Sequence, residues 1–201
     1  MVHGYGQNAE SFRKKTGAIR RSAKQFVGDW HFVEAHLDAP PREELKEGPG
    51  GKAWWLWNQS YTNPINTGWK ESLDQLTHVL ETEGPFDGVF GFSQGASMVS
   101  LLIAEQNRTG KHLFDFAVLI GGFLPRMEEM RNLIVSGVAG TPVKTWHSFG
   151  EKDEIIPSKM SMELVDALIP NATVCPPHPG GHLVSSSKEV RDSFKSWISS
   201  L

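Results

Sequence analysis

The chain alternates short apolar runs with longer amphipathic stretches, a pattern typical of an α/β protein. Five apolar runs, each closed by Gly, Pro or Asp, predict strands at 30–35, 86–92, 116–120, 144–149 and 172–175. Five stretches with helical spacing predict helices at 11–26, 67–83, 94–106, 158–168 and 187–198. Strands separated by helices imply a mainly parallel sheet with helices on both faces. Functional groups are then expected at the carboxyl ends of the strands.

One long stretch, residues 38–66, does not follow this alternation. It is rich in Pro, Gly and Trp and has no sustained period, so we interpret it as a functional loop or lid rather than a linker. The rest of the chain contains neither an internal repeat nor a low-complexity tract, and 201 residues is an ordinary length for one domain. We therefore expect a single domain over residues 1–201.

Composition and charge narrow the class of protein. Apolar residues form 39% of the chain and charged residues 21%, which is typical of globular proteins and argues against disorder. The basic cluster from Arg13 to Lys24 falls in a predicted helix, and with a net charge of -3 we expect no nucleic-acid partner. The single cysteine, Cys175, suits a reducing compartment. No stretch resembles a signal peptide or a membrane span, so we expect a cytoplasmic enzyme.

The clearest chemical signal is the G-x-S-x-G pattern that surrounds Ser93. An apolar strand runs directly into the pattern and a helix-like run follows it, which is the context of a nucleophile elbow. Gly91 and Gly95 would allow the close backbone approach that such a strained turn needs. An ordinary glycine-rich turn is the alternative, but the position between strand and helix favours a nucleophile.

A serine hydroxyl becomes a strong nucleophile only when a histidine base and an orienting acid assist it, in the chain order Ser, acid, His. Asp153 lies in mid-turn after the strand at 144–149, although it could instead cap the next helix. His182 follows two glycines in the loop after the last predicted strand, where a histidine could reach both partners. His178 is the rival, but flanking prolines restrict its backbone.

Acyl transfer also needs two backbone amides aimed at the developing oxyanion. Gln94 provides one by its position directly after the nucleophile. The H-G turn formed by His3 and Gly4 exposes the next amide, that of Tyr5, as the second. We expect Tyr5 and Gln94 to form the oxyanion hole, and His3 to be structural.

Three tryptophans lie close together in the irregular stretch, namely Trp54, Trp55 and Trp57. They suggest an apolar wall beside the site, suited to an acyl chain or a hydrophobic alcohol. Equally, they could pack inward and anchor the long loop on the domain. We expect no metal and no organic cofactor, because no cluster of His, Cys and carboxylates shows ligand spacing.

Four separated motifs combine these signals: H-G-x-x-Q-N at 3–8, G-F-S-Q-G-A at 91–96, G-x-x-D-x-x-x-P at 150–157 and H-P-G-G-H at 178–182. Together they resemble the FSH family of serine hydrolases, within the α/β-hydrolase superfamily. The resemblance implies a carboxylic-ester or thioester hydrolase with nucleophile Ser93, acid Asp153 and base His182. Family members usually carry a full apolar strand before H-G, whereas this chain has only Met1 and Val2 there. We therefore expect the first strand to be shortened or missing.

Three functions are compatible with these residues. The first is cleavage of ester or thioester bonds of small, hydrophobic acyl substrates through an acyl-enzyme on Ser93. The second is a non-catalytic hydrolase-fold module that binds a hydrophobic ligand. The third keeps the enzyme but changes the reaction to peptide or lactone hydrolysis. The sequence leaves the oligomeric state open.

Overall fold

The computed structural model describes residues 1–40, 50–57 and 66–201 of the chain. A parallel sheet of four strands, in the order β5-β6-β7-β8, forms its centre. These strands are β5 (Gly88–Phe92), β6 (Phe116–Ile120), β7 (Lys144–Ser148) and β8 (Ala172–Val174). They correspond to the last four strands that the sequence predicts, so the α/β class with a parallel sheet is confirmed.

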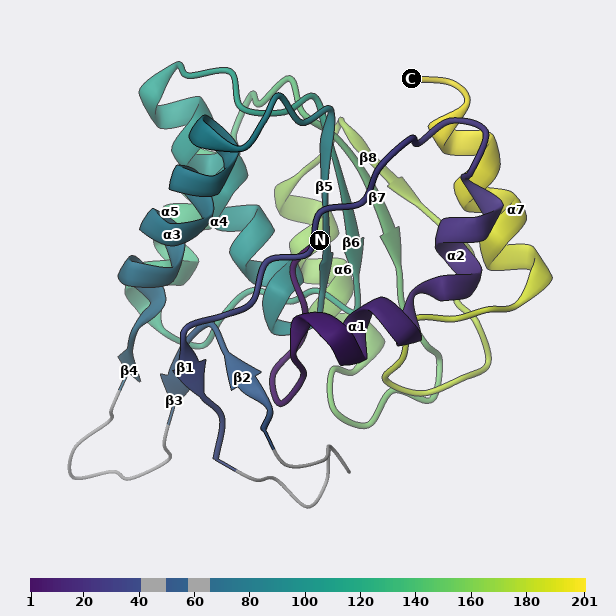
Figure 1. Cartoon of the computed structure of the whole chain (residues 1–201), viewed down its shortest axis with the longest axis horizontal. Helices are drawn as coiled ribbons and strands as arrows, with labels where there is room; N and C mark the ends of the chain where they lie inside the picture. The colour runs from purple at the N-terminus through teal and green to yellow at the C-terminus, as the bar shows by residue number, and fades with distance from the viewer. Residues whose placement is uncertain (41–49, 58–65) are drawn as a thin grey trace.

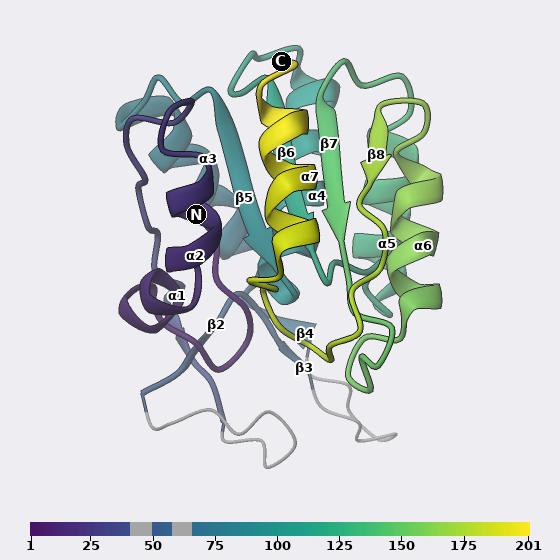
Figure 2. The same ribbon diagram turned by 90° about the vertical axis from the view of Figure 1, so that its right-hand side faces the viewer.

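Helices cover both faces of the sheet (Figures 1 and 2). One face carries α3 (Trp69–Thr82), α4 (Gln94–Thr109), α5 (Glu128–Gly137) and α6 (Ser158–Ala167). The opposite face carries α1 (Ala9–Lys15), α2 (Gly17–Ser22) and α7 (Lys188–Ile198). Figure 2 looks onto the sheet with α7 in front of the strands.

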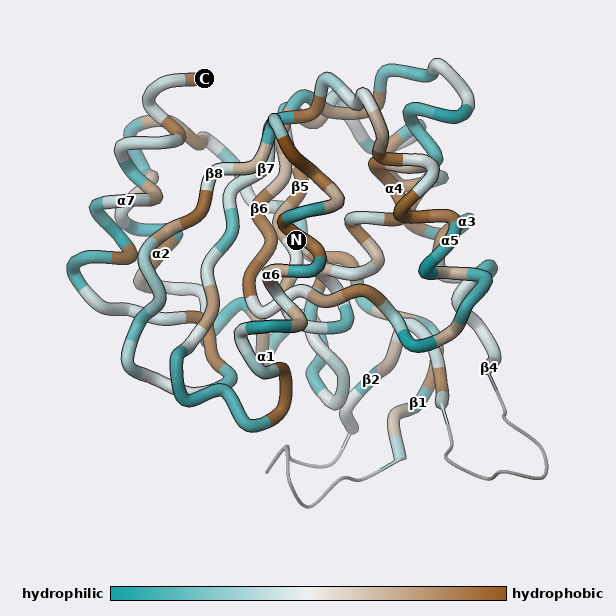
Figure 3. Tube along the Cα trace, turned by 180° about the vertical axis from the view of Figure 1, so that it is seen from behind, coloured by the Kyte–Doolittle hydropathy of each residue, from teal (hydrophilic) through white to brown (hydrophobic). Residues whose placement is uncertain are grey.

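Alternate residues of each strand point to opposite faces and therefore fill two cores. Val89 and Leu119 belong to the core beneath α3 to α6, whereas Phe90 and Ile120 belong to the core beneath α1, α2 and α7. Figure 3 shows β5 and β6 as mainly apolar stretches in the middle of the molecule. Strands that are buried on both faces have near-continuous apolar runs, which is why the sequence pattern located them well.

The predicted strand at 30–35 is wrong. Val33 forms only an isolated parallel bridge with Val2, and Val2 in turn bridges Gly91 of β5. The Val2 amide donates to the Phe90 carbonyl, and the Phe92 amide donates to the Val2 carbonyl. Val2 is thus a single residue of strand pairing between β5 and the 30–35 segment. Because Val2 offers the 30–35 segment only one residue to pair with, that segment does not form a strand.

Two helices differ from the sequence prediction. The stretch predicted as one helix at 11–26 divides into α1 and α2 at Thr16, whose hydroxyl donates to the Phe12 carbonyl at 2.8 Å. The residue after it is Gly17, a weak helix former, so the break falls where propensity is lowest. Helix α5 was not predicted, although Met130 and Ile134 are spaced to bury one face of it.

The described parts of the 38–66 stretch are more regular than the sequence suggests. They include strand β2 (Lys52–Ala53), which pairs with β1 (Leu37–Asp38), and β3 (Leu56–Trp57), which pairs with β4 (Asn66–Thr67). The remaining parts, 41–49 and 58–65, lie outside the described residues, so the predicted lid is untested there. Among the described helices, none combines the length and the apolar character needed to cross a membrane.

Candidate active site

Ser93 lies in a strained turn between β5 and α4. Its φ of 54° and ψ of -120° make it the one non-glycine residue with positive φ in the described parts of the chain. A Cβ on Gly95 would collide with the carbonyl oxygens of Val2 and His3, and a Cβ on Gly91 would meet the backbone of α4. The two glycines of the motif are therefore required by close backbone contacts, as expected for a nucleophile elbow.

The structure brings the three predicted site residues into one chain of hydrogen bonds. The Ser93 hydroxyl lies 2.8 Å from His182 Nε2, and His182 Nδ1 lies 2.7 Å from Asp153 Oδ2. Because an ionised carboxylate only accepts, Nδ1 carries the proton and Nε2 is the nitrogen that accepts from Ser93. This is the tautomer that a general base needs.

Asp153 is held by its own turn. Its side chain is 1% exposed, and its Oδ1 accepts hydrogen bonds from the amides of Ile155 at 3.0 Å and Ile156 at 2.7 Å. The alternative that Asp153 caps the next helix does not apply, because Pro157 occupies that position before α6. One carboxylate oxygen is thus fixed by the backbone while the other remains for His182.

His182 lies in the loop before α7, and its ring is positioned by Phe92 and Gly121. The Phe92 ring packs on the imidazole with ring centroids 4.8 Å apart, and Gly121 leaves the space that the ring occupies. The rival His178 lies elsewhere in the loop, where its Nδ1 accepts from the Gly180 amide and its carbonyl accepts from the Glu151 amide. Burial lowers the pKa of His178, which favours its neutral, structural form.

The two amides proposed for the oxyanion hole border the nucleophile. Gln94 is the first residue of α4, and the first amides of a helix have no acceptor within it. Tyr5 lines the same cavity as Ser93 and Gln94. A Cβ on Gly4 would lie 3.3 Å from the Ser93 Cβ, so the turn that carries Tyr5 lies directly against the nucleophile.

His3 supports this turn from inside the protein. Its Nε2 accepts from the Ala35 amide at 3.1 Å, and its Nδ1 donates to the Gly4 carbonyl at 2.8 Å. The ring is fully buried, and burial lowers the pKa of His3 to about 4. These contacts fit the structural role that the sequence suggests.

The three tryptophans divide between the two interpretations left open by the sequence. Trp55 and Trp57 line the cavity beside Ser93, as an apolar wall would. Trp54 does not line it: the side chain is 0% exposed and its indole N–H donates to the His3 carbonyl at 2.8 Å. The expected substrate contact of Trp54 is therefore corrected to a core position that anchors the loop.

The side chain of Gln94 is a feature that sequence reasoning missed. Its Oε1 accepts from the Trp54 amide at 2.8 Å, and its Nε2 donates to the Trp55 carbonyl at 2.8 Å. The Ser72 hydroxyl donates to the Trp54 carbonyl at 2.6 Å and holds the same segment from α3. An amide side chain at the start of a buried helix needs such partners, and that need was the available signal.

Ser93 and His182 open into a cavity of about 840 Å³ at the carboxyl end of the sheet. Most of its wall is apolar, with contributions from Trp55, Trp57, Phe123, Ile156, Met160 and Leu183. The volume falls in the range of small-molecule pockets. Within the described residues, no group of three His, Cys, Asp or Glu side chains is arranged to hold a metal ion.

Comparison with known proteins identifies similar chains over nearly the full length. A family model described as "Serine hydrolase (FSH1)" matches residues 1–194. Esterase OVCA2 of Danio rerio is 31% identical, covering 98% of this chain and 94% of that protein. Esterase C25G4.2 of Caenorhabditis elegans is 32% identical, covering 98% of this chain and 90% of that protein.

Solved structures share the fold at lower sequence identity. Zea mays acyl-protein thioesterase 2 matches with a TM-score of 0.63 and 19% identity, covering 98% of this chain and 90% of that one. Arabidopsis thaliana SOBER1 matches with a TM-score of 0.67 and 16% identity, covering 98% of this chain and 95% of that one. The chain therefore shares its fold with a solved acyl-protein thioesterase.

Proposed function

This chain belongs to the FSH1 family of serine hydrolases, and from that membership we propose that Ser93, His182 and Asp153 cleave ester or thioester bonds in it. The observation that carries the proposal is the chain of hydrogen bonds from the Ser93 hydroxyl through His182 to Asp153, at 2.8 and 2.7 Å. These contacts join residues 89 and 29 positions apart in the sequence, at a cavity that can hold a substrate.

In the first half of the reaction, His182 Nε2 takes the proton as Ser93 Oγ attacks the carbonyl carbon. The amides of Tyr5 and Gln94 donate to the oxyanion that forms, and Asp153 stabilises the imidazolium. Collapse of the tetrahedral intermediate breaks the bond to the alcohol or thiol, which receives the proton from His182. The acyl group remains on Ser93 as an ester.

Water completes the cycle on the same residues. His182 takes a proton from the water, whose oxygen attacks the acyl carbon. The second tetrahedral intermediate then expels Ser93 Oγ, which regains its proton from His182. A carboxylic acid leaves and the enzyme returns to its starting state.

The proposed substrates are small acyl esters or thioesters with a hydrophobic part. Trp55, Trp57 and Phe123 supply apolar wall next to the nucleophile, which favours burial of hydrocarbon over a peptide backbone. We also propose a cytoplasmic location, because a single buried cysteine suits a reducing compartment. The extent of the domain, 1–201, is proposed from the single sheet that both cores share.

Labelling with a fluorophosphonate probe tests the proposal. The probe should form one covalent adduct on Ser93, identified by mass spectrometry of the digested protein. Ser93→Ala should abolish the adduct and lower kcat/KM for acyl esters by several powers of ten, since the residues of a triad act as a unit. Ser100→Ala is the matched control, because its hydroxyl donates to the Ala96 carbonyl within the same helix.

The outcomes separate the alternatives. A Ser93→Ala variant that hydrolyses esters as fast as the parent would contradict the proposal. An unlabelled parent that still binds hydrophobic ligands would indicate a non-catalytic module. Parallel assays of matched acyl esters, thioesters, amides and lactones would show which bond the intact site prefers.

A further inference from the structure

Arg126 places a positive charge in the wall of an otherwise mainly apolar cavity. The residue lies on the segment between β6 and α5, where it is exposed between the buried Pro125 and Met127. Its side chain lines the cavity that contains Ser93. The guanidinium lies 5.6 Å from the centroid of the Trp57 ring, so the cation rests on an aromatic face.

Two carboxylates of α5 and α6 pair with cations other than Arg126. Glu129, in the first turn of α5, pairs with Lys70 at 2.8 Å. Glu163 of α6 pairs with Arg131 at 3.3 Å. Among the described residues, no ion pair involves Arg126. Its guanidinium therefore keeps its hydrogen-bond donors available toward the cavity.

Within the described parts of the chain, three ionic side chains line the cavity, and two of them are cations. Lys15, at the end of α1, and Arg126 are positive, whereas Glu154 is negative. The guanidinium of Arg126 supplies positive charge on the wall beside Trp57, and that charge attracts an anion. Of the two cations, Arg126 offers the planar donor pair that matches a carboxylate.

We propose that Arg126 recognises a carboxylate, or a group of the same shape and charge, at the end of the substrate remote from the scissile bond. This inference rests on the proposed esterase or thioesterase function and defines its substrate class. The hydrocarbon next to the scissile bond contacts the apolar wall, and the anion accepts two hydrogen bonds from the guanidinium. Contact with the Trp57 ring restricts the guanidinium, so less conformational entropy is lost on binding.

Matched substrates measure the contribution of charge alone. p-Nitrophenyl monoesters of dicarboxylic acids, with four to ten carbons, carry the anion on the acyl side. The same compounds with a terminal carboxamide are neutral and of nearly equal shape. A second pair, hexanoyl esters of a hydroxybenzoate and of the corresponding hydroxybenzamide, carries the anion on the alcohol side. The two pairs distinguish which half of the substrate reaches Arg126.

Arg126→Gln should lower kcat/KM for the anionic member of one pair by about 10- to 100-fold, mainly through KM, since a charged hydrogen-bonded contact contributes about 1.5–3 kcal/mol. The neutral member should change by less than about threefold. Arg126→Lys should retain part of the preference, because it keeps the charge but loses the planar donor pair. Arg108→Gln removes the same charge at the far end of α4 and should leave kcat/KM for all four kinds of substrate unchanged.

The proposal is overturned if Arg126→Gln affects charged and neutral members equally in both pairs and at every chain length. Failure of the underlying function has a different signature, because the parent would then hydrolyse none of the substrates and Ser93 would not react with the fluorophosphonate. Thermal unfolding of each variant shows that the exposed substitutions leave the fold intact.

Discussion

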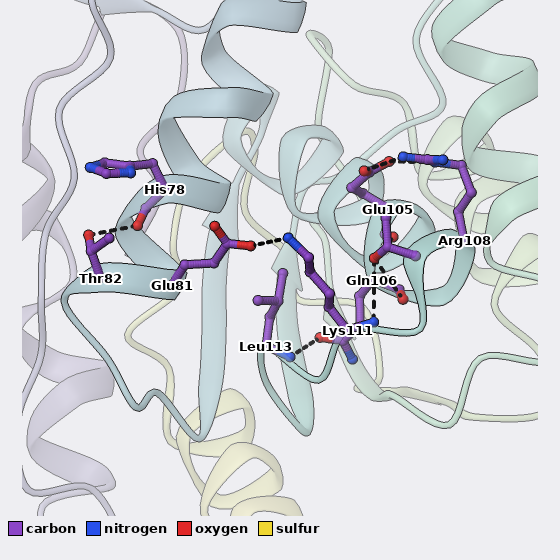
Figure 4. A network of polar contacts seen from close by, with 9 residues as sticks. His78, Glu81, Thr82, Glu105, Gln106, Arg108, Lys111 and Leu113 are labelled. Carbon is purple, nitrogen blue, oxygen red and sulfur yellow. Dashed lines mark hydrogen bonds and ion pairs between the residues drawn. The ribbon is translucent and has the colours of Figure 1, made fainter.

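Two buried glutamines at opposite ends of α4 both use their side-chain amides to bind the backbone of another segment. The segments that they hold differ in their importance for the site. Gln94, at the amino end, uses its amide to hold the backbone of Trp54 and Trp55. Gln106, near the carboxyl end, accepts from the amides of Leu113 and Phe114 and donates to the Phe114 carbonyl. Figure 4 shows Gln106 and its contact with Leu113 in the surrounding polar network.

The difference lies in how far along the chain each glutamine reaches. Gln94 reaches about 40 positions back, to the segment that forms part of the cavity wall. Gln106 reaches only 8 positions forward, to the loop that leads into β6. The glutamine at the amino end of α4 therefore holds a distant segment, whereas the one near the carboxyl end holds a neighbouring loop.

The two ends of α4 also differ in backbone strain and in the burial of charged groups. At the amino end, Ser93 has positive φ and Asp153 is buried beside His182. At the carboxyl end, Gly110 takes up the positive φ at no cost. Energy stored in an unusual conformation has to be offset by surrounding contacts, and such positions cluster at functional sites. Hydrogen bonds to distant segments therefore hold the reactive end of this helix in place.

The largest effect should come from Asp153→Asn at the amino end of α4. An asparagine amide would donate to His182 and favour the wrong tautomer, so kcat should fall roughly 10⁴-fold while the fold persists. Steady-state hydrolysis of an acyl ester measures the change. Asp192→Asn is the control, since this exposed aspartate pairs only with Lys188 on α7. A loss smaller than about tenfold would show that Asp153 does not orient the base.

Truncating the two glutamines tests the comparison directly. Gln94→Ala and Gln106→Ala each leave buried backbone groups without a partner, which should lower the free energy of unfolding by about 2–4 kcal/mol in both variants. Urea unfolding measures that loss. Only Gln94→Ala should also lower kcat/KM, by about 10- to 100-fold, because the wall at Trp55 and the adjacent amide move relative to Ser93.

The control within this experiment is the activity of Gln106→Ala. Its kcat/KM should remain within about twofold of the parent once the assay temperature lies well below the unfolding transition. Equal activity losses in both variants would remove the distinction between the two ends. A Gln94→Ala variant that is as stable as the parent but less active would make Gln94 a positioning residue with little effect on stability.

Sequence reasoning succeeded where the signal is local. The elbow around Ser93 is a five-residue pattern between an apolar strand and a helix, so its geometry is encoded in adjacent residues. The strands β5 and β6 are apolar on both faces and were located for the same reason. The positions of Asp153 and His182 followed from chain order together with loops at strand ends.

Sequence reasoning failed where a residue depends on a distant partner. Trp54 and Trp55 are adjacent in the chain and both are buried, yet of the two only Trp55 lines the cavity. The His3 carbonyl accepts from the Trp54 indole and Gln94 holds the Trp54 backbone, so Trp54 packs in the core. The segment at 30–35 has the composition of a strand, but its pairing depends on Val2. Neither the core position of Trp54 nor the missing strand at 30–35 can be predicted from neighbouring residues alone.

Acid should loosen the amino end of α4 before the carboxyl end. The Nε2 of His3 accepts from Ala35, so the folded state keeps this ring neutral until the pH approaches about 4. The unfolded chain takes up the proton near pH 6.5, so stability is complete above that pH and falls as the pH drops toward 4. The loss should be about 2–3 kcal/mol, measured by urea unfolding.

Other titratable groups also contribute to the loss of stability in acid, and the variant His3→Gln separates the contribution of His3 from theirs. Burial lowers the pKa of His147 in β7 to about 3, so it adds to the slope, whereas Glu34 opposes part of the shift at His3. His3→Gln keeps an acceptor that does not titrate and should flatten the dependence between pH 6.5 and 4. An unchanged slope would show that His3 does not link protonation to folding.

The smallest effect should come from the exposed ion pairs at the carboxyl end of α4. Arg108 pairs with Glu105, and Lys111 pairs with Glu81 of α3. Water competes for these charges, and holding two long side chains together costs entropy, so such pairs contribute about 0–1 kcal/mol. Arg108→Gln and Lys111→Gln should each leave the midpoint of urea unfolding and kcat/KM unaltered. A clear loss of stability that 1 M salt reproduces in the parent would mean that this end is held by its charges rather than by Gln106.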